Sequence, residues 1–237
     1  MPLIEAPGAP RFRSNGTAER FHSIGTRARA IRRSLETAGR MGDIHALGHV
    51  MEAPAPLSVP RTVALVGLMG AGKSAIGKRL AARLGLPFVD ADDEIERAAG
   101  CTIAEFFERR GEAEFRAGER RVISRLLAGP AHVLSTGGGA YMDPETRTLM
   151  RERALTIWLR AELEVLYDRV KRRGHRPLLS NGEPKEILAR LMIQRYPVYA
   201  EADLIVDSTA QPADVTTEQV IEALRNHLAP QPAGAAA

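Results

Sequence analysis

Cysteine is almost absent from this chain, and aromatic residues are scarce. Cys101 is the one cysteine among 237 residues, which excludes an internal disulfide and a cysteine-rich metal site. A single cysteine fits a reducing compartment and predicts a cytoplasmic protein. The six histidines are scattered without the spacing of a zinc site. Aromatic residues make up only 5% of the chain, and none is interleaved in the basic segment 171–179, which disfavours binding of single-stranded nucleic acid.

Long hydrophobic runs and a broad charge excess are also missing. No apolar run approaches the about 20 residues that a membrane-spanning helix needs, so we expect no membrane partner. The net charge of +4 arises within residues 1–50, which hold eight arginines and four acidic residues. The remainder holds 25 basic and 25 acidic residues, and this balance predicts no nucleic-acid partner.

Residues 1–58 differ in composition from the rest and are predicted to be an N-terminal extension. Prolines bracket an Arg-rich middle, and segment 18–38 has the pattern of one short amphipathic helix with too few apolar anchors for a domain. Three interpretations stay open: a disordered tail, a targeting peptide, and a helix that docks on a partner or a membrane surface. Met41 and Met51 are alternative start sites. The Ala/Pro-rich segment 229–237 is predicted to be disordered.

From residue 59 to residue 228 the pattern of one α/β domain appears. Short apolar segments rich in Val, Leu and Ile are typical of strands buried on both faces. They alternate with helical segments, which predicts an open parallel sheet with helices on both faces and a ligand site at the carboxyl ends of the strands. The expected strands are 62–66, 86–90, 131–136, 154–160 and 203–206. The expected helices are 72–84, 92–99, 102–110, 112–128, 144–152, 161–172, 184–200 and 214–228.

The first expected strand leads into the pattern G-x-x-x-x-G-K-S at residues 67–74. This is the phosphate-binding P-loop, in which glycines let backbone N–H groups curl around a phosphate at the start of a helix. Lys73 is expected to reach the β- and γ-phosphates, and Ser74 offers its hydroxyl to Mg²⁺. The pattern therefore predicts a nucleotide-phosphate site.

Two acidic residues and three glycines follow the next two expected strands. Asp90 and Asp92 suit a water-mediated Mg²⁺ contact and the acceptance of a hydroxyl proton. The alternative is that they cap the helix over 92–99 and line its first turn. Gly137, Gly138 and Gly139 allow a ligand to approach the backbone closely. All of these residues are expected on the same rim as the P-loop.

Arginines complete the set of candidate residues. Arg116 and Arg195 are suited to bidentate recognition of a carboxylate, although single arginines are most often surface residues. The basic, Gly- and Pro-containing segment at about 171–183 is predicted to be a lid that brings Arg176 onto transferring phosphates. The alternative is a solvated basic loop.

The ordered motifs of residues 60–226 resemble the shikimate kinase family. They are G-L-M-G-A-G-K-S, F-V-D-A-D, E-F-R, S-T-G-G-G-A, R-P-L-L and R-x-P-x-Y. The resemblance implies a P-loop fold of the nucleoside-monophosphate-kinase type, with three αβα layers, a five-stranded parallel sheet in the order 2-3-1-4-5, a helical substrate-binding region and a lid. It implies transfer of the γ-phosphate of ATP to the 3-hydroxyl of shikimate, with Mg²⁺ as cofactor, in the biosynthesis of chorismate and the aromatic amino acids.

The resemblance also implies roles for individual residues. Lys73, Asp92 as the base, and Arg176 would be catalytic. Ser74 would bind Mg²⁺ directly, and Asp90 would do so through water. The ATP-binding set would be Gly70, Ala71, Gly72, Lys73, Ser74, Ala75, Arg169, Arg176 and Gln211. The shikimate-binding set would be Asp92, Phe107, Phe115, Arg116, Gly137, Gly138, Gly139 and Arg195.

Two other functions stay open at this stage. One is a related small-metabolite kinase such as a gluconate kinase, which the joint presence of Asp92, Arg116 and Arg195 disfavours. The other is a ligand-sensing regulatory module, which would carry a helix-turn-helix domain that residues 1–58 are too short and too polar to form. We expect a monomer that acts on a small molecule.

Overall fold

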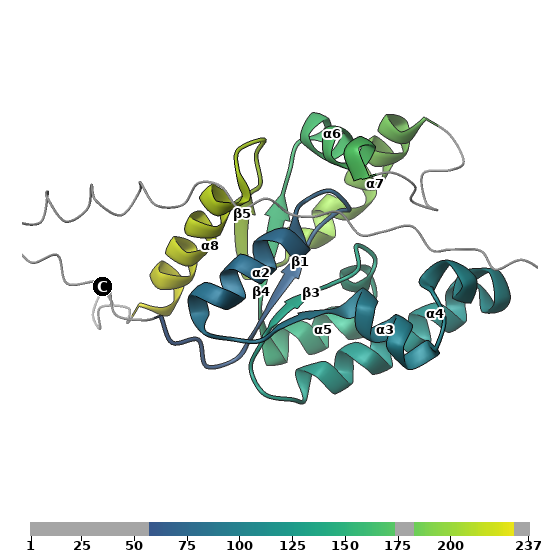
Figure 1. Ribbon diagram of the computed structural model, residues 1–237, viewed down its shortest axis with the longest axis horizontal. Helices are drawn as coiled ribbons and strands as arrows, with labels where there is room; N and C mark the ends of the chain where they lie inside the picture. Colours follow the sequence, from purple (N-terminus) through teal and green to yellow (C-terminus); the bar gives the residue numbers. More distant parts are fainter. Residues whose placement is uncertain (1–56, 174–182, 230–237) are drawn as a thin grey trace, which may run out of the picture. The chain divides into compact units, whose positions relative to one another are not determined.

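A five-stranded parallel sheet lies at the centre of the fold (Figure 1). The computed structural model describes residues 57–173 and 183–229. The strands lie in the order β2-β3-β1-β4-β5, so the predicted order 2-3-1-4-5 is confirmed. Their bounds are β1 Thr62–Val66, β2 Phe88–Asp90, β3 Val133–Ser135, β4 Ala154–Arg160 and β5 Leu204–Asp207.

Helices alternate with these strands, as the sequence pattern predicts. Their bounds are α2 Lys73–Leu84, α3 Ala91–Ala99, α4 Ile103–Leu127, α5 Pro144–Arg153, α6 Leu163–Arg173, α7 Pro184–Tyr199 and α8 Ala213–Leu228. A short 3-10 turn, η1 Ala140–Met142, follows β3 and was not expected. The predicted helices 102–110 and 112–128 form one element, α4, in which Gly111 takes the non-helical angles φ 78° and ψ 177°. The expected break is therefore present as a kink within a longer helix.

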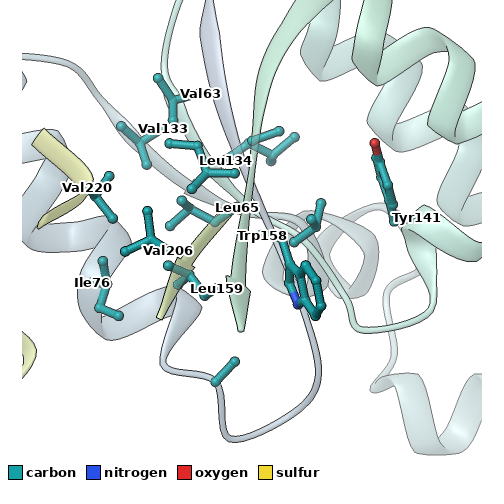
Figure 2. Close-up of a cluster of buried hydrophobic side chains, with 14 of the residues drawn as sticks. Val63, Leu65, Ile76, Val133, Leu134, Tyr141, Trp158, Leu159, Val206 and Val220 are labelled. Carbon is teal, nitrogen blue, oxygen red and sulfur yellow. The ribbon is translucent and has the colours of Figure 1, made fainter. Parts of the chain in front are cut away.

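The sheet carries hydrophobic side chains on both faces. Every residue of β1 is buried, and the first six of the seven residues of β4 are buried, as expected for strands covered by helices on both sides. Figure 2 shows Leu65 and Leu159 beside Ile76 of α2 and Val220 of α8. Trp158, whose side chain points away from that group, lies toward the side of Tyr141 in η1. The alternation of strand residues thus supplies two hydrophobic layers.

Helices α3 and α4 pack on each other and enclose a second, smaller core. It is built on Ile95, Phe115 and Val122, with Ile103, Phe106, Phe107 and Leu126 packed around them. The start of α4 is fixed by a capping box between Thr102 and Glu105. This small core holds the part of α4 that carries the E-F-R motif.

The strand register brings the motif-bearing loops to one rim. Ser135, the last residue of β3, pairs with Leu65 of β1 on one side and with Asp90 of β2 on the other. The P-loop, the start of α3 and the glycine run 137–139 each follow one of these strands. They therefore leave the sheet at the same level, as parallel strands require.

Some predictions concern residues outside the described ranges. These are most of the N-terminal extension 1–58 with its helix at 18–38, the central part of the lid with Arg176, and residues 230–237 of the C-terminal tail. Within the described ranges, no helix is both long and apolar enough to cross a membrane.

Candidate active site

The P-loop joins β1 to α2 at the rim. Gly72 precedes the first residue of α2 and has φ 95°, a left-handed conformation that favours glycine. Lys73 Nζ donates to the carbonyl oxygens of Gly67 at 2.8 Å and Leu68 at 3.0 Å. The lysine thus lies over its own loop, at the positively polarised amino end of α2, where a phosphate is stabilised.

Ser74 and Asp90 are in direct contact beside the P-loop. Ser74 Oγ donates to Asp90 Oδ2 at 2.7 Å and lies 3.3 Å from Ser135 Oγ. Asp90 Oδ1 also accepts from the backbone N–H of Asp92 at 3.1 Å and so caps α3. The cap predicted as the alternative is therefore present, while the other carboxylate oxygen accepts from the P-loop hydroxyl. Hydroxyl and carboxylate oxygens are ligands that suit Mg²⁺.

Arg116 lies against the glycine run that follows β3. A Cβ placed on Gly139 would lie 2.5 Å from Arg116 Nη1, so the guanidinium occupies the space that a side chain would need. Arg116 Nη1 donates to Glu119 Oε2 at 2.6 Å, and Arg116 Nη2 lies 3.4 Å from Glu112 Oε1. Burial would lower the pKa of Arg116, but Glu119 and Glu112 raise it above its ordinary value. The guanidinium is therefore a permanent positive charge beside the glycine run.

Glu119 is a site residue that the sequence did not reveal. Its side chain is 3% exposed, and burial raises its pKa even though Arg116 acts in the opposite direction. A Cβ placed on Gly137 would lie 2.9 Å from Asp92 Oδ1 and 3.0 Å from Glu119 Oε1. Asp92 and Glu119 thus converge on one glycine. The i, i+3 spacing from Arg116 was the only available signal, and that spacing occurs on most helices.

Two residues of α7 reach the middle glycine of the run. Arg195 Nη1 donates to the carbonyl oxygen of Gly138 at 3.0 Å, and the hydroxyl of Tyr199 donates to the same oxygen. The structure therefore brings Arg195 to the glycine run, as expected. Tyr199 was present in the R-x-P-x-Y motif but had no predicted role.

Arg169 of α6 lies on the other side of the P-loop. Its Nη1 lies 3.2 Å from the carbonyl oxygen of Gly70 and donates to Ser208 Oγ at 2.9 Å, and its Nη2 donates to the carbonyl oxygen of Thr209. Gln211 is exposed in the same loop, and its backbone N–H donates to Thr209 Oγ1. Arg169 therefore links the P-loop to the loop after β5.

Phe107 and Phe115 lie next to each other, with ring centroids 4.5 Å apart. Phe115 is buried in the core between α3 and α4, and the guanidinium carbon of Arg116 lies 5.1 Å from the centre of its ring. The two rings therefore pack beside the part of α4 that carries Arg116.

Within the described ranges, the residues predicted from the P-loop, F-V-D-A-D, E-F-R, G-G-G and R-x-P-x-Y motifs thus gather at one rim, with acidic, basic and glycine groups around the P-loop. A separate surface hollow lies near the opposite ends of the strands, where it is lined by Arg147 and Arg151 of α5 and by Glu201 and Asp203 before β5. That hollow contains none of the predicted residues. Among the described residues, no cluster of three or more His, Cys, Asp or Glu side chains forms a metal site.

Comparisons with known proteins identify the family of this chain. Residues 69–225 match the family model described as shikimate kinase. The chain belongs to the shikimate kinase family. Shikimate kinase of Paramagnetospirillum magneticum is 56% identical over 170 residues, which cover 72% of this chain and 87% of that protein. Shikimate kinase of Rhodopseudomonas palustris is 54% identical over 172 residues, covering 73% and 85% respectively.

A solved structure shares the fold as well. Shikimate kinase from Acinetobacter baumannii in complex with shikimate is 35% identical, with a TM-score of 0.69 over 71% of this chain and 95% of that one. Membership of the shikimate kinase family and the P-loop fold are thus confirmed. The predicted activity, an ATP-dependent kinase of shikimate, is confirmed with them.

Proposed function

We propose that the rim residues form an active site for phosphorylation of the shikimate 3-hydroxyl, with a nucleotide half that binds ATP and a substrate half that binds shikimate. The observation that carries this proposal is the convergence of Asp92, Arg116 and Arg195 on the glycine run beside the P-loop. Arg116 and Arg195 would bind the carboxylate of a small acid held there, and Asp92 would be the base at its other end. Two halves built in this way favour positioning as the main source of catalysis.

The nucleotide half is the P-loop with its flanking arginine. Backbone groups of Gly70–Gly72 and the start of α2, including Ala71 and Ala75, would surround the ATP phosphates. Lys73 would neutralise charge on the β- and γ-phosphates. Arg169 would pack against the adenine, and Gln211 would contact the nucleotide from the same side. Ser74 would hold Mg²⁺ directly and Asp90 through water, and the ion supplies charge neutralisation when bound.

The substrate half is the glycine run with its two arginines. Arg116 and Arg195 would bind the carboxylate of shikimate, and the backbone of Gly137–Gly139 would contact its ring substituents. Asp92 would accept the proton of the 3-hydroxyl while the hydroxyl oxygen forms a bond to the γ-phosphorus and the bond from that phosphorus to ADP breaks. Phe107 and Phe115 would wall the pocket. Neutral sugars have no carboxylate for the two arginines to bind, which disfavours them as substrates.

Further predictions concern the parts outside the described ranges. We propose that Arg176, on a lid at about 171–183, adds positive charge to the transferring phosphate. Residues 59–228 would form the catalytic domain, with 1–58 and 229–237 as extensions that the reaction does not need. A monomeric state, a cytoplasmic location and the absence of nucleic-acid partners also stay predictions.

The test is kinetic and uses Asp92→Asn. We expect kcat with shikimate to fall at least about 100-fold, while the KM for ATP stays within about twofold of the wild-type value, because Asp92 faces the substrate hydroxyl. ADP release would be followed with ATP, Mg²⁺ and either shikimate or gluconate. An unchanged kcat in the variant would remove the assigned role, and faster wild-type turnover of gluconate than of shikimate would contradict the proposed function.

A further inference from the structure

Tyr199 ends α7 with its hydroxyl on the glycine run. Its side chain is completely buried, and the hydroxyl donates to the carbonyl oxygen of Gly138, 61 residues away in the sequence. Arg195 Nη1 donates to the same oxygen at 3.0 Å. Residues four apart lie on the same face of a helix, so α7 presents both donors together. One carbonyl of the substrate loop is therefore held by two side chains of a single helix.

This anchoring determines which way the loop presents its backbone. The peptide group between Gly138 and Gly139 is planar and trans, so its carbonyl and its N–H point in opposite directions. When the carbonyl of Gly138 is held toward α7, the N–H of Gly139 points away from α7. Glycine has no side chain that could fix this orientation locally. The hydrogen bonds from α7 therefore take over that task.

The ring of Tyr199 is itself held in place. Its centroid lies 5.9 Å from that of Trp158, 6.4 Å from that of Tyr196 and 6.4 Å from that of Tyr141. Tyr141 belongs to η1, the turn that begins immediately after Gly139. Tyr199 thus contacts the substrate loop through its hydroxyl and the following turn through its ring. Burial raises the pKa of Tyr199 to about 12, so the hydroxyl remains a donor throughout the neutral range.

We propose that Tyr199 is a positioning residue for shikimate: it holds the carbonyl of Gly138 and so orients the glycine run and Arg195 toward the substrate. The inference rests on the proposed function of this rim as the shikimate site. Tyr199 lies behind the loop and acts through it, without touching the reacting atoms. Removal of the Tyr199 hydroxyl should therefore weaken shikimate binding and leave the nucleotide half intact.

The test removes only the hydroxyl, with Tyr199→Phe. We expect the KM for shikimate, and its dissociation constant by calorimetry, to rise about five- to tenfold, as for the loss of one hydrogen bond. The KM for ATP and the dissociation constant for ADP should stay within about twofold, and kcat should change less than the KM for shikimate.

Tyr196→Phe is the matched control. Tyr196 lies on the same helix and in the same aromatic group, and its hydroxyl also donates to a backbone carbonyl, but that carbonyl belongs to Ala161. It should leave the KM for shikimate unchanged. Equal effects of the two variants on this KM would overturn the inference, as would a Tyr199→Phe protein that is unfolded or binds ADP weakly. A wild-type protein that does not phosphorylate shikimate would overturn the proposed function and this inference together, whereas normal turnover with an unaltered KM in Tyr199→Phe would overturn the inference alone.

Discussion

Gly139→Ala should weaken shikimate binding while the protein stays folded. The new Cβ would lie 2.5 Å, 2.6 Å and 2.7 Å from Nη1, Nη2 and Cζ of Arg116, so the guanidinium has to move. Gly139 has φ −95° and ψ −18°, which alanine adopts without strain. The guanidinium is the far end of a flexible side chain and can move aside, but the move breaks its hydrogen bond to Glu119 and costs about 1–3 kcal/mol of folding free energy. The protein should stay folded, and the substrate that Arg116 is proposed to bind loses its partner.

The size of the effect follows from the contacts that are lost. A hydrogen bond to a charged group contributes about 1.5–3 kcal/mol, so the KM for shikimate should rise about 10- to 100-fold. The KM for ATP should stay within about twofold, because the contacts of Lys73 with Gly67 and Leu68 are not disturbed. Initial rates of ADP release, with shikimate varied at saturating ATP and Mg²⁺, measure both constants. Thermal unfolding measures the stability.

Gly118→Ala is the control for this experiment. Gly118 lies on α4, two residues after Arg116, and a Cβ placed there meets no atom within 4 Å beyond the neighbouring backbone of its own helix. Alanine in a helix is more favourable than glycine by about 1 kcal/mol, so this variant should be at least as stable as the wild type and unchanged in KM. A Gly139→Ala protein with the wild-type KM for shikimate would refute the placement of Arg116. So would an equal rise in the KM for ATP.

Three further predictions follow from the described contacts. Glu119→Gln should raise the KM for shikimate several-fold, because Arg116 loses its ion pair with Glu119. Thermal unfolding at pH 7 should nevertheless show no loss of stability, because burial raises the pKa of Glu119 and makes its ionised form unfavourable in the folded state. A marked fall in the melting temperature would contradict this. The raised pKa of Tyr199, about 12 against an ordinary 10.0, means that its stabilising protonated form is fully present below pH 10 and lost as the pH rises toward 12. In urea unfolding, the stability of the wild type relative to Tyr199→Phe should therefore fall by about 1.4 kcal/mol per pH unit over that window, and a flat difference would be the contrary result. Asp203→Ala removes the acceptor of the backbone N–H and hydroxyl of buried Thr156, and should lower the free energy of unfolding by about 2–4 kcal/mol while both KM values stay unchanged.

Local sequence patterns predicted much of the fold. The strand expected at 154–160 is β4 at its predicted limits, and the helix expected over 72–84 begins one residue later, at Lys73. Short strands were predicted too long, as at 131–136, where β3 covers only Val133–Ser135. Strand ends depend on which neighbouring strand supplies a hydrogen-bond partner, and the sequence does not contain that information locally.

The candidate site was predictable to the extent that its residues belong to motifs. Arg116 and Arg195 were named from motifs far apart in the chain, and the structure brings both to the same glycine run. Asp90 was weighed as either a cap or a metal partner; one of its oxygens caps α3 and the other accepts from Ser74 Oγ, and its metal role stays a prediction. Glu119 and Tyr199 were not predicted. In the sequence, Glu119 looks like an ordinary surface residue of a helix and Tyr199 like an ordinary core residue, and only their neighbours in the fold reveal their contacts with the site.

By itself, the sequence determined the P-loop, the order of the motifs, the alternation of strands and helices, and through them the family. These features depend on residues close together in the chain, whose backbone preferences and hydrophobic spacing act locally. Only the tertiary structure decided that Arg116 fills the space above Gly139, that Glu119 and Asp92 meet at Gly137, and that Tyr199 holds the carbonyl of Gly138. Each of these contacts joins separate elements across the rim, and close packing of the whole domain is what brings their atoms together.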